Sequence, residues 1–251
     1  MTRFGAIIQA RQNSSRLPGK MSKDLHGKPL IARVVEQISY SDRLDHVIVA
    51  TSDEESDNVL ADLCESYGID CYRGSLNNVL KRFIDAAEQF GLDVIIRVTG
   101  DNPLTDPKLI DSVISEFKNN PELEYINNVH RDGSVHGSGC ELVTLPALQR
   151  VYDQVKNDPD RGDYQEHVTF YIRKHHNQFN TKKYFPQDRL SRPEISYSVD
   201  YPEDFILVEK IYKSLYREGK PFDTGKVLEF LDQNPELLEI NSSLHDELPD
   251  Y

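Results

Sequence analysis

The chain has 251 residues, 38% of them hydrophobic and 28% charged, and carries a formal net charge of −13 at pH 7. This balance is typical of a soluble globular protein, and the sequence holds no apolar run of the roughly 20 residues that a membrane-spanning helix needs. The excess of acid argues against nucleic acid as a partner, because phosphate contacts need an extended basic surface.

Cysteine usage and the start of the chain point to the same compartment. Cys64, Cys71 and Cys140 show neither a Cys-x-x-Cys spacing nor a histidine pair at zinc-site intervals, so we expect reduced thiols. The first apolar run begins at Phe4, which leaves no room for a secretory signal sequence. Both features predict a cytoplasmic protein.

Apolar runs of strand length alternate with amphipathic stretches of helix length through the first half of the chain. Strands are predicted at 4–10, 47–51, 69–74 and 93–101, and helices at 29–41, 55–68, 75–91 and 106–120. The runs VIVAT and VIIRV are apolar throughout, which is typical of parallel strands covered by helices on both faces. The pattern therefore predicts a doubly wound α/β fold.

The second half is less regular. Segment 125–145 contains glycines and short β-like runs, and we expect it to form a β-ribbon arm with a loop that faces a ligand. Further helices are predicted at 146–156, 161–175, 202–217 and 223–232. The polar, acidic segment 240–251 is compatible with disorder or with packing on the domain. With no repeat or linker to divide the chain, we interpret residues 1–251 as a single domain.

A compact basic loop, residues 11–20, follows the first strand. Ligands of parallel sheets bind beyond the carboxyl ends of strands, where such loops lie. Arg11, Arg16 and Lys20 are its charged residues, and guanidinium and ammonium groups bind phosphate oxygens. The loop lacks the GxxxxGK[ST] spacing of a P-loop, and Met21 follows the lysine. It predicts a site for a small polyanion such as a triphosphate; the alternative is a solvated surface loop.

Two carboxylates follow predicted strands. Asp101 comes directly after the run VIIRVTG, and Asp200 follows ISYSV. Side chains so placed can converge on one hard cation such as Mg²⁺, which takes few protein ligands. The alternative is that both residues cap helices or form turns.

Seven segments, in order, resemble a known family of cytidylyltransferases. This family includes the spore-coat polysaccharide biosynthesis proteins and, more distantly, the CMP-sialate and CMP-3-deoxy-manno-octulosonate synthetases. The matching segments are IIQARQNSSRLPGK (7–20), GKPLI (27–31), VIVATSD (47–53), YRGSLNNVLKRF (72–83), RVTGDNPLTDPKLID (97–111), QEHVTFYI (165–172) and VDYPEDF (199–205).

The resemblance implies a Rossmann-like, three-layer nucleotidyltransferase with a mainly parallel mixed sheet, and with a homodimer as its assembly. It implies transfer of CMP from CTP to a sugar acid or sugar-phosphate-like acceptor, with Mg²⁺ as cofactor and release of pyrophosphate, for a surface polysaccharide or glycan. By position the catalytic residues would be Arg11, Arg16, Lys20 and Asp101, with Asp101 and Asp200 holding the Mg²⁺.

The same resemblance assigns the binding residues. The nucleotide would contact Gln9, Ala10, Arg11, Arg16, Lys20, Thr51, Ser52, Arg73, Ser75 and Arg82. Charge and position suggest that an anionic acceptor would contact Arg131, His136, Glu141, Glu166 and His167.

Departures from the family pattern keep other functions open. Asn77 and Asn78 stand where an acid is common, and His136-Gly-Ser-Gly-Cys-Glu141 replaces Asp-Gly-x-Asp-x-Glu, so acceptor and base specificity stay undetermined. A metal-dependent glycosyltransferase is one alternative, although Asp101-Asn-Pro lacks the second acid of a DxD pair. A non-catalytic nucleotide-binding homologue is the other.

Overall fold

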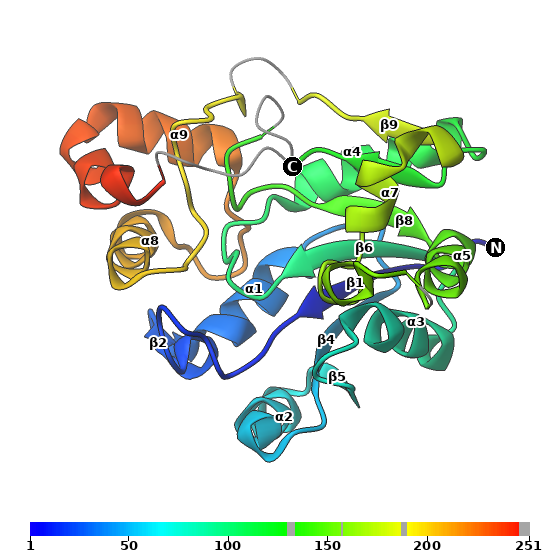
Figure 1. Ribbon diagram of the computed structural model, residues 1–251. Coiled ribbons are helices and arrows are strands. Elements are labelled where there is room, and N and C mark those ends of the chain that lie inside the picture. Colours follow the sequence, from blue (N-terminus) through cyan, green and yellow to red (C-terminus); the bar gives the residue numbers. More distant parts are fainter. Residues whose placement is uncertain (130–133, 157, 187–189, 246–251) are drawn as a thin grey trace.

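The computed structural model describes residues 1–129, 134–156, 158–186 and 190–245. A seven-stranded sheet in the order β5-β4-β1-β6-β8-β7-β9 forms its middle layer (Figure 1). Four neighbouring strands run parallel, namely β1 (Phe4–Gln9), β4 (His46–Ser52), β5 (Asp70–Gly74) and β6 (Val94–Thr99). This arrangement confirms the predicted α/β class with a mainly parallel mixed sheet.

The segment predicted to be a β-ribbon extends the same sheet. Strand β8 (Glu141–Thr144) pairs antiparallel with β6, and β7 (Tyr125–Asn127) pairs antiparallel with β8. The edge strand β9 (Thr181–Lys183) then runs parallel to β7. Apolar side chains of β7 and β8 are buried in the core, so both strands belong to the central layer; residues 130–133 between them lie outside the described residues.

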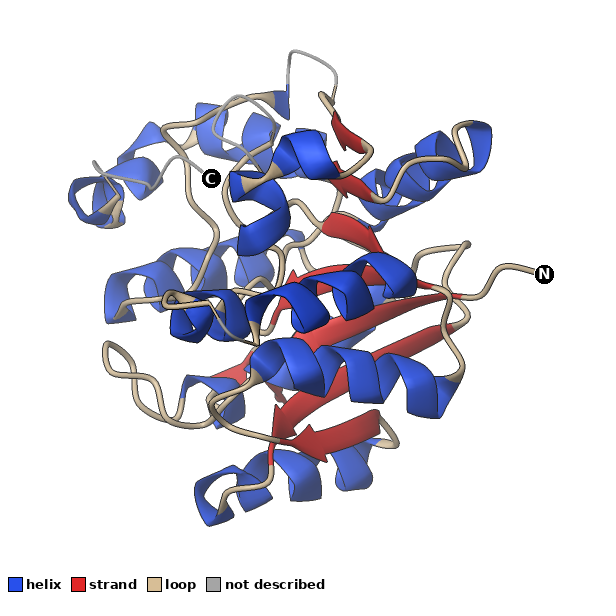
Figure 2. Cartoon of the chain, turned by 45° about the vertical axis from the view of Figure 1, so that its right-hand side comes forward, coloured by secondary structure: helices blue, strands red, loops and turns tan. Residues whose placement is uncertain are grey.

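Helices cover both faces of the sheet (Figure 2). One face is covered by α1 (Leu30–Ile38), α2 (Asn58–Tyr67) and α4 (Pro107–Asn119). The other is covered by α3 (Val79–Phe90), α5 (Leu145–Val155), α6 (Arg161–Glu166) and α7 (Phe170–Lys174). Along β1, Ile7 packs with the second set while Ala6 and Ile8 pack with the first, as the two-residue period of a strand requires.

A third apolar cluster lies around the C-terminal helices α8 (Pro202–Leu215) and α9 (Thr224–Gln233), beside the sheet (Figure 1). Short 3₁₀ turns and a small two-stranded sheet complete the fold: η1 (Lys20–Ser22), β2 (Asp24–Leu25), β3 (Lys28–Pro29), η2 (Glu55–Asp57), η3 (His176–Gln178), η5 (Pro235–Ile240) and η6 (Ser242–Leu244). No helix in the described ranges has the length and apolar character to cross a membrane.

The described part of the C-terminal segment packs on the domain. Asn241 Nδ2 donates to Asp204 Oδ1 at 2.8 Å, and a ring nitrogen of His245 lies 2.7 Å from the same oxygen. Asp204 belongs to the first turn of α8, so residues up to 245 are tied to that helix. Residues 246–251 of the predicted tail lie outside the described residues.

One predicted helix, 161–175, is divided. Helix α6 ends at Glu166, α7 begins at Phe170, and residues 167–169 form the break. Val168 is buried in the core at this point, and Thr169 Oγ1 donates to buried Glu141 at 2.8 Å. Two β-branched residues with these tertiary partners favour the break over a continuous helix, because helix propensity is a weak preference that packing overrides.

Candidate active site

Two adjoining cavities open at the carboxyl ends of β1 and β6. The first, which we call the basic cavity, has a volume of about 450 Å³ and is lined largely by the loop after β1. The second, the inner cavity, has a volume of about 250 Å³ and is lined by β6, β8 and the segments around 136 and 198. Five residues line both: Gln9, Thr99, Asp101, His167 and Asp200. The two spaces therefore meet at a pair of carboxylates.

The loop after β1 turns its basic residues in different directions. Gly19 has φ 70°, a left-handed conformation that glycine adopts without strain, and it precedes η1. Lys20, the first residue of η1, is only 5% exposed, whereas the side chains of Arg11 and Arg16 are about half exposed at the cavity mouth. The loop thus supplies one buried ammonium and two accessible guanidinium groups.

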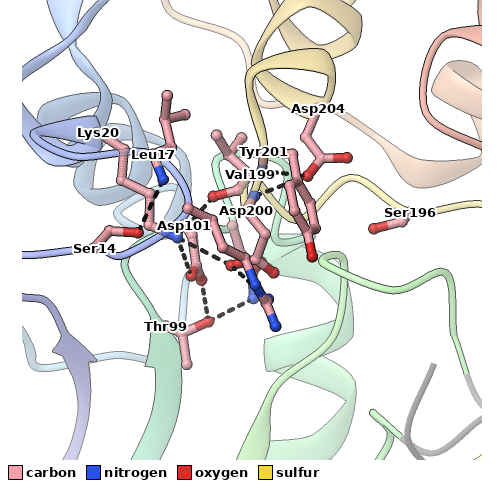
Figure 3. Close-up of polar contacts among 12 residues, drawn as sticks. Ser14, Leu17, Lys20, Thr99, Asp101, Ser196, Val199, Asp200, Tyr201 and Asp204 are labelled. Atoms are coloured by element: carbon pink, nitrogen blue, oxygen red, sulfur yellow. Dashed lines mark hydrogen bonds and ion pairs between the residues drawn. The ribbon is translucent and has the colours of Figure 1, made fainter. Parts of the chain in front are cut away.

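Lys20 is bound to both carboxylates (Figure 3). Its Nζ donates to Asp101 Oδ2 at 2.9 Å, to Asp200 Oδ1 at 3.2 Å and to the carbonyl oxygen of Val199 at 2.7 Å. Burial alone would lower the pKa of Lys20, but Asp101 and Asp200 raise it above its ordinary value. Burial would likewise raise the pKa of Asp101, yet Lys20 holds it below its ordinary value. The ammonium and the Asp101 carboxylate are therefore both charged at neutral pH.

Each carboxylate is held by its own neighbours. Thr99 Oγ1 donates to Asp101 Oδ1 at 2.6 Å. The backbone N–H groups of Asp200 and Tyr201 donate to Asp204 Oδ2 at 2.9 and 2.8 Å, and Figure 3 shows Asp204 beside Tyr201 on the same segment. Since Asp204 is fully buried, this loop is anchored to the interior at the start of α8.

The carboxylate pair fits a hard divalent cation. Asp101 and Asp200 already converge on one cation, the Lys20 ammonium, and their side chains are 20% and 28% exposed toward the cavities. Within the described ranges there is no cluster of three or more His, Cys, Asp or Glu residues that could enclose a metal. A site with two carboxylates is the kind in which Mg²⁺ keeps several waters and substrate phosphates as ligands.

The inner cavity contains a guanidinium held from behind. Arg97 lies on β6, two residues before Thr99, so both side chains lie on one face of the strand. Its Nη1 forms an ion pair with Glu141, and its Nη2 donates to Gln9 Oε1 at 3.3 Å. Glu141 is 1% exposed and also accepts from the hydroxyl groups of Tyr125 and Thr169. The Glu141 oxygens are thus engaged inside the protein, while Arg97, with 15% of its side chain exposed, lines the cavity.

A histidine completes the inner cavity. His136 Nδ1 lies 2.9 Å from Ser196 Oγ, and the backbone N–H of Tyr197 donates to the His136 carbonyl at 2.7 Å. At Gly137, with φ 90°, a Cβ atom would lie 2.6 Å from the Ser198 nitrogen, so the two segments approach too closely for a side chain. Burial, together with nearby His245, holds the pKa of His136 below its ordinary value. The imidazole is therefore neutral at pH 7.

The structure brings together most of the residues that the sequence singled out. Gln9, Ala10, Arg11, Arg16, Lys20, Arg82, Asp101 and Asp200 line the basic cavity. Glu166 and His167, assigned to the acceptor, also line the basic cavity; Glu166 lies 3.5 Å from Arg11, and His167 reaches both cavities. His136 and Glu141 line the inner cavity, and Arg131 lies outside the described residues.

Four residues that were predicted to contact the nucleotide do not line either cavity. Thr51, Ser52, Arg73 and Ser75 are not among the described residues that line either space. Ser52 Oγ donates to Asp57, and Arg73 donates to the backbone carbonyl oxygens of Ser52 and Glu54. The carbonyl oxygen of Ser75 accepts from Arg82 at 3.0 Å, which positions this buried arginine at the cavity.

Sequence reasoning missed Thr99, Val199, Arg97 and Arg173 as members of the site. Arg97 and Thr99 could have been found from the two-residue alternation along β6, which puts them on one face. Val199 acts through its backbone oxygen, and Arg173 reaches the inner cavity from α7; neither has a local sequence signal.

Comparisons with known proteins find one enzyme family that matches almost the whole chain. A family model described as cytidylyltransferase matches residues 5–232. The spore coat polysaccharide biosynthesis protein SpsF of Bacillus subtilis is 33% identical over 237 residues, which cover 92% of this chain and 94% of that protein. The solved structure of a cytidylyltransferase from Leptospira borgpetersenii aligns over 100% of both chains, with a TM-score of 0.87 and 25% identity.

A more distant structure has the same fold. It is a CMP:2-keto-3-deoxy-manno-octonic acid synthetase solved in complex with CTP, and the alignment covers 85% of this chain and 99% of the synthetase. The TM-score is 0.65 and the identity 17%. At this identity the likeness concerns the fold alone.

Proposed function

This chain belongs to the cytidylyltransferase family, and from that premise we propose that it transfers CMP from CTP to an anionic, sugar-like acceptor and releases pyrophosphate. The observation that carries the proposal is the junction of the two cavities at Asp101 and Asp200. A nucleotide in the basic cavity and an acceptor in the inner cavity would bring the α-phosphorus and the acceptor oxygen together there.

The basic cavity supports a triphosphate as the first substrate. Arg11, Arg16 and Lys20 line it, together with the buried Arg82. Guanidinium groups bind phosphate oxygens in pairs, and an ammonium adds a compact charge. CTP is the preferred nucleotide in this proposal because the chain belongs to the cytidylyltransferases.

The inner cavity supports a small anionic acceptor. Arg97 lines it and is held in place by Glu141, so the guanidinium is fixed before a ligand arrives. A planar guanidinium matches a carboxylate or a phosphate. Neutral His136 adds a polar group that can hydrogen-bond to a sugar hydroxyl. The Bacillus subtilis relative is named for polysaccharide biosynthesis, and we propose a surface glycan as the destination of the product here too.

The chemistry follows from these positions. An acceptor hydroxyl oxygen forms a bond to the α-phosphorus, the bond from that phosphorus to the bridging oxygen breaks, and the electron pair leaves with pyrophosphate. The hydroxyl proton is released to solvent water. Lys20 and the two loop arginines bind the phosphate chain and neutralise the charge that develops on the leaving group. Asp101 and Asp200 would hold Mg²⁺, whose chemistry is to neutralise phosphate charge.

The test is pyrophosphate release with CTP, UTP, GTP or ATP and Mg²⁺, against a panel of sugar acids and sugar phosphates. We expect release with CTP and one acceptor class, and loss of release in Asp101→Asn. Sugar transfer from a nucleotide sugar without pyrophosphate release would favour a glycosyltransferase. Tight nucleotide binding without turnover on any acceptor would favour a non-catalytic homologue, and absence of nucleotide binding would refute the proposal.

A further inference from the structure

The protein carries an internal cation where a divalent metal would bind. Lys20 has three ammonium protons, and its Nζ has three oxygen acceptors at 2.7, 2.9 and 3.2 Å. Two of these acceptors are carboxylate oxygens of Asp101 and Asp200, the third is the Val199 carbonyl, and the residue is only 5% exposed (Figure 3). The ammonium is thus saturated by the site rather than directed at solvent.

Lysine and metal would require the same space. Mg²⁺ binds oxygen at about 2.0–2.1 Å, so a cation shared by Asp101 Oδ2 and Asp200 Oδ1 would lie very close to the present Nζ position. Like charges a few ångströms apart repel strongly in a poorly solvated site. Arg16 adds further positive charge, with its Nη1 3.9 Å from Asp200 Oδ1. The negative charge of Asp101 and Asp200 is therefore already balanced by Lys20 and Arg16.

A polyphosphate offers the lysine an alternative partner. Lys20 lines the basic cavity, and its long side chain can turn from the carboxylates toward phosphate oxygens without movement of its backbone. Taking the proposed function as given, we infer that Lys20 is the resident counter-ion of the carboxylate pair. It keeps Asp101 and Asp200 together before substrate arrives and excludes a divalent cation until a nucleoside triphosphate draws the ammonium away. Metal and nucleotide then enter the site together.

Binding of Mn²⁺ to the nucleotide-free protein tests this inference, because the electron paramagnetic resonance signal of unbound Mn²⁺ reports binding without any turnover. We expect wild type to bind Mn²⁺ weakly and Lys20→Met, which keeps length and removes charge, to bind one Mn²⁺ at least about tenfold more tightly. Lys23→Met, a change of an exposed lysine three residues away, should behave as wild type. Lys20→Met combined with Asp101→Asn should lose the gain.

Thermal unfolding gives a second readout. Mn²⁺ should raise the Tm of Lys20→Met, and restore its folding if the unpaired carboxylates prevent folding, but should leave the wild-type Tm unchanged. Equal Mn²⁺ affinity in wild type and Lys20→Met, or no effect of Mn²⁺ on the variant's Tm, would overturn the inference. When either of these results is found in a wild type that turns over CTP, this inference fails and the proposed function stands. A wild type that neither binds nor turns over CTP would refute the proposed function.

Discussion

The two cavities are built in different ways. In the basic cavity, half of the polar lining residues come from one continuous segment, residues 9–21, and the others are Arg82, Thr99, Asp101, Glu166, His167 and Asp200. The inner cavity is lined by Gln9, by Val129 and by residues of four distant segments, 97–102, 135–141, 167–173 and 198–200. A binding surface made by one loop can be read from local sequence, whereas one assembled by sheet pairing and helix packing requires the fold. Substitutions at the junction and in each cavity should therefore have different effects.

The largest expected effect lies where the cavities meet. Asp101→Asn removes the carboxylate that contacts Lys20 and that would hold the metal, so we expect kcat to fall by about a thousandfold, the scale for loss of an electrostatic group at a reacting centre. Steady-state pyrophosphate release measures it, and Asp62→Asn on the exposed side of α2 is the matched control. Retained activity in Asp101→Asn would show that the reaction does not occur at the junction.

Removal of the buried carboxylate behind Arg97 should affect stability most. Glu141→Gln breaks a buried ion pair by taking one partner, which we expect to lower the free energy of unfolding by about 3 kcal/mol. Tyr125→Phe removes only one hydrogen bond to that carboxylate and should lower it by about 1 kcal/mol. Urea denaturation measures both, with Glu229→Gln, an exposed residue of α9, as control. If Glu141→Gln lowers the free energy of unfolding no more than Glu229→Gln does, Glu141 does not anchor Arg97.

A pair of conservative changes should separate the two cavities by substrate. Arg97→Lys keeps the charge beside Glu141 but loses the guanidinium fork, so we expect the KM for acceptor to rise about tenfold with the KM for CTP unchanged. Arg16→Lys should raise the KM for CTP and leave the acceptor KM unchanged, by a smaller factor because Arg16 is half exposed. Each variant controls for the other, and equal shifts in both constants would mean that the cavities are not separate sites.

The smallest expected effect concerns how the free energy of unfolding depends on pH. Glu141 changes this dependence in acid and not at neutral pH. Burial alone would raise the pKa of Glu141, but Arg97 and Arg173 hold it below the ordinary 4.5 in the folded protein. The unfolded chain therefore binds more protons, and this group's contribution to stability is complete above pH 4.5 and declines as the pH falls toward its folded-state pKa. In urea denaturation between pH 3 and pH 7, the free energy of unfolding should fall less steeply in acid for Glu141→Gln than for wild type. Equal slopes would contradict the depressed pKa.

The sequence predicted the parallel half of the fold, and it singled out basic loop residues that line one of the two cavities. Continuous apolar runs identified β1, β4 and β6, and the helices predicted at 55–68, 75–91 and 106–120 contain α2, α3 and α4. The loop containing Arg16 and Lys20 needed only local chemistry to be found. These are features in which residues near in sequence determine the structure.

The inner cavity depends on tertiary contacts that no local sequence pattern predicts. The pairing of Arg97 with Glu141 arises because β8 aligns these residues across the sheet. The break between α6 and α7 that places His167 depends on the partners of Val168 and Thr169. Thr51 is fully buried within β4, and the apolar run VIVAT gives no local signal that separates it from a residue at the cavity.

The contacts of Asn241 and His245 with Asp204 can form only late in the synthesis of the chain. The loop that carries Asp200 is anchored by Asp204, and Asp204 is in turn contacted by Asn241 and His245, among the last described residues. A nascent chain lengthened from the N-terminus can form the basic loop and the parallel strands early. The anchor of Asp200 is complete only after residues 241 and 245 have been synthesised and have folded onto α8. The two carboxylates of the pair are therefore positioned at different stages of chain synthesis, Asp101 before Asp200.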